Sequence, residues 1–99
     1  MVQKVSKKWI TADSRALFEA ILGLKTLPEA QNFFRDLLTE AEIKEFSSRW
    51  KAVRMLSDKA SYTEITAATG LSSRTIARIN SWLKQGMGGY RMMIKRTSP

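Results

Sequence analysis

The spacing of apolar side chains is the feature that most constrains the fold of this chain. From Ile43 to Leu56, apolar residues recur three or four positions apart, which is the period of one face of an α-helix. No segment has the strict alternation of apolar and polar residues that is typical of a half-buried strand. We therefore predict an all-α fold of five to six helices.

Capping residues predict where these helices begin and end. Thr39 with Glu42, and Ser61 with Glu64, form two capping boxes, in which each side chain accepts a backbone N–H at the helix start. Gly70 is typical of a helix end, where the chain adopts a left-handed conformation. The predicted helices are 14–22 (Asp13 as its cap, Gly23 at its end), 28–38, 40–57, 62–69 and 73–84 (Ser72 or Ser73 as its cap), with further turns at 90–96.

The net charge of +8 is unevenly distributed. Residues 61–99 carry six basic side chains and one acidic side chain, Glu64, whereas residues 1–60 carry 11 basic and 8 acidic side chains. A basic segment almost free of carboxylates suits a polyanion, because each neutralised phosphate releases counterions. A basic protein with no nucleic-acid partner stays an alternative at this point.

Several classes of protein are disfavoured by what the sequence lacks. It contains neither cysteine nor histidine, which removes disulfides, the commonest zinc ligands and the commonest general base. We find no nucleophile–base pair and no phosphate-binding loop, so we predict no enzymatic activity, no metal and no cofactor. No apolar run exceeds three residues, so we predict neither a membrane span nor a signal peptide. We predict that the protein is cytoplasmic and associated with the nucleoid.

Two short helices around Gly70 carry the functional signal. Their apolar residues, among them Ile65 and Ile76, are spaced so that the helices can pack on each other, as in a helix-turn-helix. The outward side chains of the second helix, at about 73–84, can all form hydrogen bonds and include no carboxylate, which suits a helix in the major groove. The predicted DNA-binding residues are Thr63, Ser72, Ser73, Arg74, Thr75, Arg78, Ser81 and Lys84. An ordinary solvated helix pair is the alternative.

Residues 33–84 resemble the Trp repressor superfamily. The resemblance lies in Leu38-Thr39 with Glu42, in Arg49 ten residues after Thr39, and in Ser61, Glu64-Ile65, Gly70, Thr75-Ile76 and Arg78. Phe33-Phe34-Arg35-Asp36-Leu37 and Thr75-Ile76-Ala77-Arg78 are most similar to its YerC/YecD-like branch. The resemblance implies an intertwined homodimer with a shared N-terminal core, whose paired recognition helices read a near-palindromic operator.

The same resemblance bears on tryptophan as an effector. Thr39, Arg49 and Arg78 match residues of the repressor's tryptophan pocket. Ile79 and Trp82, however, replace a glycine and a serine of that pocket, and we expect the larger side chains to fill it. We therefore predict that tryptophan is not the co-repressor, and any other effector stays open. An ion pair with Glu45 is the alternative role of Arg49.

We interpret the chain as one Trp-repressor-like domain. It comprises a basic arm (1–11), dimerisation helices (12–58), a helix-turn-helix (61–85) and a tail (86–99). The predicted function is sequence-specific binding of double-stranded DNA by a homodimeric transcription regulator, a repressor. The alternative is a helical dimer that acts as a protein-interaction module and does not read DNA.

Overall fold

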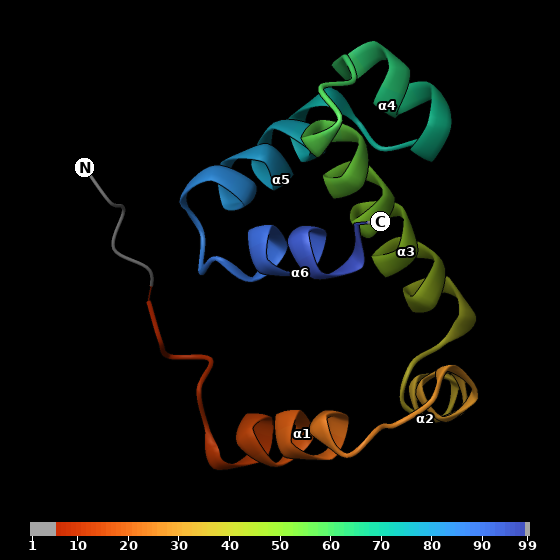
Figure 1. Cartoon of the computed structure of the whole chain (residues 1–99), viewed down its shortest axis with the longest axis vertical. Helices are drawn as coiled ribbons and strands as arrows, with labels where there is room; N and C mark the ends of the chain where they lie inside the picture. The colour runs from red at the N-terminus through yellow and green to blue at the C-terminus, as the bar shows by residue number, and fades with distance from the viewer. Residues whose placement is uncertain (1–5, 99) are drawn as a thin grey trace. The chain divides into compact units, whose positions relative to one another are not determined.

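The structure is a computed structural model that describes residues 6–98. Residues 1–5 of the predicted basic arm lie outside the described residues, as does Pro99. The described chain forms α1 (Ala12–Leu22), α2 (Leu27–Leu37), α3 (Glu40–Ser57), α4 (Tyr62–Thr69), α5 (Ser73–Gln85) and α6 (Gly89–Thr97), and contains no strand (Figure 1). The predicted all-α class is confirmed. Within residues 6–98, none of the helices has the length and apolar character needed to cross a membrane.

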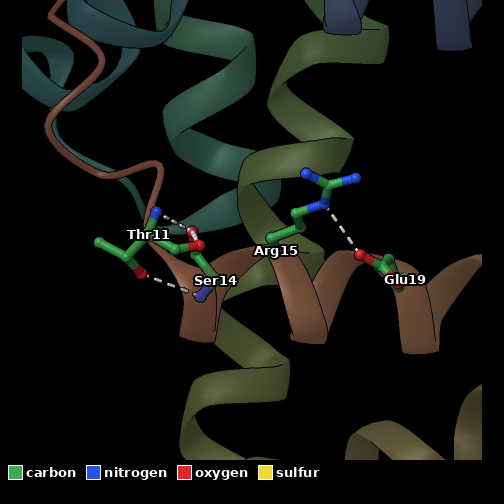
Figure 2. A network of polar contacts seen from close by, with 4 residues as sticks. All are labelled: Thr11, Ser14, Arg15 and Glu19. Carbon is green, nitrogen blue, oxygen red and sulfur yellow. Dashed lines mark hydrogen bonds and ion pairs between the residues drawn. The ribbon is translucent and has the colours of Figure 1, made fainter.

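Two compact units make up the described chain, residues 6–43 and residues 44–98. In the first unit, α1 begins earlier than predicted, because its cap is Thr11 and not Asp13. The Thr11 hydroxyl accepts the Ser14 N–H at 3.0 Å, and the Ser14 hydroxyl accepts the Thr11 N–H at 2.8 Å (Figure 2). A serine at the third helical position thus closes a capping box that usually uses Glu or Gln.

Aromatic side chains pack at two places in the first unit. Trp9 meets the edge of Phe18 with ring centroids 6.1 Å apart, which fixes the segment before α1 against that helix. In α2, Phe33 and Phe34 form a second edge-to-face pair at 5.5 Å. The cap of α2 is Thr26, so this helix begins and ends one residue before the predicted bounds.

The first unit has no buried side chain. Every residue from 6 to 43 is exposed or half-buried, although the unit contains many apolar side chains. Leu22 is 84% exposed and Leu27 is 71% exposed. Apolar residues on helices normally lose most of their exposure to a core, so this unit holds apolar surface that the chain alone does not cover.

The predicted capping box at the start of α3 is confirmed. The Thr39 N–H donates to Glu42 Oε1 at 2.9 Å, and the Glu42 N–H donates to Thr39 Oγ1 at 3.1 Å. The hydrogen bonds from the Thr39 backbone N–H and the Thr39 side chain lower the pKa of Glu42 below its ordinary value of 4.5. The cap therefore favours the ionised carboxylate.

Replacement of Glu42 by glutamine tests this pKa. A lowered folded pKa means that the stabilisation is present above pH 4.5 and is lost as the pH falls through the folded value. We expect the stability of the wild type to fall relative to that of Glu42→Gln between about pH 6 and about pH 3, because Gln accepts the same N–H without titrating. Urea unfolding of both proteins at both pH values measures this, and a constant difference would contradict the prediction.

The second unit contains the core. Its buried side chains are Ala52, Val53, Ile65, Ile76 and Ile79. They come from α3, α4 and α5, which lie side by side in Figure 1. After α5 the chain turns back, and α6 packs on α5 with Tyr90 and Ile94 against this core. The core therefore holds the two helices of the predicted motif to the long helix α3.

Candidate nucleic-acid interface

The turn between α4 and α5 has the geometry of a helix-turn-helix. Gly70 has φ +75°, the left-handed conformation predicted for it, and its N–H donates to the Thr66 carbonyl at 2.8 Å. The Thr69 hydroxyl donates to the Ile65 carbonyl at 2.7 Å and accepts the Leu71 N–H at 3.2 Å. These hydrogen bonds give partners to the polar backbone groups at the end of α4 within three residues, so α5 can start directly after the turn.

Replacement of Gly70 by alanine should destabilise the unit through the backbone alone. A Cβ at Gly70 would meet no atom within 4 Å, but its positive φ disfavours any residue with a Cβ. We expect a loss of about 1–2 kcal/mol in the free energy of unfolding.

Gly89→Ala is the matched control for this substitution. A Cβ there also meets no atom within 4 Å, and Gly89 lies in α6 without a positive φ, so we expect no loss or a gain of up to about 1 kcal/mol. Equal effects of the two substitutions in chemical denaturation would show that the turn conformation is not the cause.

Ser72 caps α5, and this settles which of the two predicted serines is the cap. Its hydroxyl accepts the Thr75 N–H at 3.2 Å and donates to Thr75 Oγ1 at 3.1 Å. Ser72 and half-buried Thr75 thus use much of their hydrogen-bonding capacity on each other. The other predicted DNA-binding residues, which are Thr63 on α4 and Ser73, Arg74, Arg78, Ser81 and Lys84 on α5, are all exposed.

Most arginines outside α4 and α5 are engaged within the chain. Arg15 and Arg49 each form an ion pair with a glutamate four residues away, and Arg35 donates to the Leu38 carbonyl. In contrast, the side chains of Arg74 and Arg78 make no hydrogen bond or ion pair with any residue between 6 and 98. Both are exposed on the same side of α5, opposite buried Ile76. They are available to an external acceptor.

One hydrogen bond between α4 and α5 was missed by the sequence analysis. Asn80 Nδ2 donates to the Tyr62 hydroxyl at 3.2 Å, between residues 18 positions apart. Arg91 of α6 was missed as well, and its guanidinium donates to the carbonyls of Leu83 and Lys84 at the end of α5. In each of these hydrogen bonds the two residues are more than one helical turn apart in the sequence, so no local spacing rule could identify the pairs.

The residues predicted to form a tryptophan pocket lie in different surroundings. Arg49 lines an open cavity of about 690 Å³, whose other lining residues are Trp50, Trp82, Met87, Gly89, Tyr90 and Met93. Arg49 also donates to Glu45 at 3.1 Å, so the predicted ion pair is confirmed. Arg78 does not line this cavity, and Thr39 caps α3 in the first unit.

The two side chains expected to fill that pocket differ in burial. Ile79 is 5% exposed and belongs to the core. Trp82 is 46% exposed and lines the cavity. A Cβ at Gly86 would lie 2.6 Å from Trp82 Cε3, so the indole lies directly against this glycine. That Ile79 and Trp82 together exclude a ligand stays a prediction.

The order of the six helices and the helix-turn-helix define an all-α protein of the Trp repressor-like fold. Residues 12–98 match the family described as Trp repressor protein. YerC of Bacillus subtilis (strain 168) is 40% identical over 80 residues, which are 81% of this chain and 77% of YerC. The chain belongs to the Trp repressor family, as its sequence motifs predicted.

Two solved structures share this fold. A TrpR-like protein from Eubacterium eligens superposes with a TM-score of 0.86 at 40% identity, over 92% of this chain and 94% of that chain. A proposed Trp repressor from Staphylococcus aureus superposes with a TM-score of 0.85 at 33% identity, over 95% of this chain and 94% of that chain. The similarity thus extends over nearly the whole chain in both cases.

Proposed function

We propose that the protein is a homodimeric, sequence-specific transcription regulator that binds double-stranded DNA with α5 in the major groove. The carrying observation is the outward side of α5, where Arg74 and Arg78 have no partner within the described chain and α5 has no acidic residue. Guanidinium groups bind guanine edges and phosphates, and the first residues of a recognition helix meet the bases. The family likeness supports a repressor that acts on the nucleoid in the cytoplasm.

The uncovered apolar surface of the first unit supports a dimer. None of the residues 6–43 is buried, and a second copy would supply the apolar contacts that this unit lacks. Twofold symmetry would then place two α5 helices against successive major grooves of one duplex. We propose that α1 and α2 contribute to this interface.

Replacement of Leu22 by lysine distinguishes a dimer from a monomer. Because Leu22 is 84% exposed in the single chain, the change should be nearly neutral in a monomer but cost about 1.5–3 kcal/mol if a partner covers the side chain. We expect analytical ultracentrifugation to give twice the 11.3 kDa of one chain for the wild type, and a weakened dimer for the variant. Ala67→Lys, at an exposed position of α4, is the control that should leave the dimer unchanged.

We further propose that DNA binding does not require tryptophan. The repressor's small pocket residues are replaced by the larger Ile79 and Trp82, and Ile79 belongs to the core. Arg49 is also occupied by Glu45. These features support a reader that is in place without this amino acid.

Capture of genomic fragments by the purified protein tests the proposed function. It is carried out at about 0.15 M salt, with and without L-tryptophan. Recovery of a few near-palindromic sites in both conditions is the expected result. Recovery only with tryptophan would overturn the ligand independence. No enrichment in either condition would overturn DNA readout and favour the protein-interaction module.

A further inference from the structure

We propose that α5 selects guanines, and that each half-site contains two G·C pairs, at most about two base-pair steps apart, that are read by Arg74 and Arg78. The inference rests on the proposed function and specifies the bases that it recognises. Arg74 and Arg78 are four residues apart, about 6 Å along the helix axis at about 1.5 Å per residue. Successive bases are about 3.4 Å apart, so the two side chains can reach bases that are at most about two steps apart.

Both guanidinium groups are uncommitted within the described chain. Arg74 lies in the first turn of α5 and Arg78 in the second, and neither side chain binds another described residue. A free guanidinium can pair with O6 and N7 of guanine in the major groove, a pattern that adenine does not offer. Both arginines are therefore able to discriminate guanine from adenine.

The first two turns of α5 contain neither asparagine nor glutamine. Asparagine and glutamine are the side chains that pair with adenine N6 and N7. Asn80 is half-buried and its amide donates to the Tyr62 hydroxyl at 3.2 Å. Gln85 is the last residue of α5, about 16 Å along the axis from Arg74 at about 1.5 Å per residue. Gln85 is thus distant from the two arginines, and Asn80 has one of its two amide N–H groups engaged within the chain.

The side chains around the two arginines are small. Ser73, Ala77 and Ser81 are exposed on the same side of α5, and none extends as far as a guanidinium. Small residues let the helix approach the floor of the groove, where a bidentate contact to guanine is possible. The Ala77 methyl, next to Arg78, suits an apolar contact with a thymine methyl.

The test begins with selection of duplexes from a random library by the wild-type protein at about 0.15 M salt. We expect two conserved guanines per half-site, with at most one position between them. In the selected duplex each guanine is then replaced singly by 7-deazaguanine, which lacks N7, or by inosine, which keeps O6 and N7. We expect 7-deazaguanine to weaken wild-type binding between about 5-fold and 150-fold, and inosine to have little effect.

Single arginine variants assign the contacts. For Arg74→Ala, 7-deazaguanine at one of the two guanines should cause no further loss, whereas it should still weaken binding at the other guanine. Arg78→Ala should give the opposite pattern. Asn80→Ala is the control, and we expect it to keep the guanine preference, because the amide of Asn80 donates to Tyr62.

The outcomes separate this inference from the proposed function. Selection of a defined duplex that has adenine at these positions, or that tolerates 7-deazaguanine, would overturn guanine readout and leave DNA binding intact. Loss of selectivity at an A·T pair in Asn80→Ala would overturn it as well. Failure to select any duplex would overturn both the proposed function and this inference.

Discussion

The Arg74→Ala/Arg78→Ala double variant should bind its selected duplex about 30-fold or more weakly than the wild type. Each base-reading arginine contributes about 1–3 kcal/mol, so loss of both should cost at least about 2 kcal/mol. Both side chains are exposed and have no partner within residues 6–98, so the folded chain loses no contact of its own. We expect the free energy of unfolding to change by less than about 0.5 kcal/mol.

A control of equal charge separates base reading from general attraction. Arg54 and Arg96 are also exposed and without a partner among the described residues, but they lie in α3 and α6. Arg54→Ala/Arg96→Ala removes the same two positive charges. Fluorescence anisotropy with the selected duplex and with a scrambled duplex should show a loss of specificity only in the α5 variant. Equal losses on both duplexes would mark Arg74 and Arg78 as phosphate contacts.

Ile76→Ala should destabilise the second unit by about 2–5 kcal/mol, the range for removing a fully buried isoleucine side chain. Ile76 is 0% exposed and shares the core with Val53 of α3 and Ile65 of α4. Its loss would leave a cavity where the two helices of the motif meet α3. A small domain has only about 5–15 kcal/mol of stability, so part of the variant should unfold at raised temperature. DNA binding should weaken accordingly.

Ile94→Ala is the control for this effect. Ile94 lies on α6, is half-buried and packs against the edge of the same core, so its removal leaves a smaller cavity. Urea unfolding of the three proteins at one fixed concentration gives the comparison, since the stability of a dimer depends on concentration. A larger loss for Ile94→Ala than for Ile76→Ala would show that the core is centred elsewhere.

Local sequence signals predicted most of the helix boundaries. The capping boxes at Thr39 and Ser61, the left-handed Gly70 and the end of α3 at Ser57 all lie where the sequence placed them. Each depends on atoms within one helical turn, so neighbouring residue types are sufficient to predict it. The predicted start of α1 was wrong. Asp13 is a good cap by residue type, but in the structure Thr11 and Ser14 form a reciprocal capping box.

The candidate site was predicted in part. The sequence identified α5, its outward arginines and the inward side chains Ile65 and Ile76, which are buried as expected. It did not predict that the amide of Asn80 is bound to Tyr62, since this bond joins two helices. Because it occupies an N–H of the Asn80 amide, this bond supports the proposal that the arginines are the base readers near the start of α5.

By itself, the sequence determined the all-α class, the helix-turn-helix and the acid-free outward side of α5, because each follows from residue spacing within one or two helices. Only the tertiary structure decided which helices bury their apolar side chains in a common core. Val53 of α3 is buried, whereas Leu22 and Leu27 stay largely exposed, although all three are apolar residues of helices. Burial depends on which helices meet in space, and that is set by contacts between residues far apart in the chain.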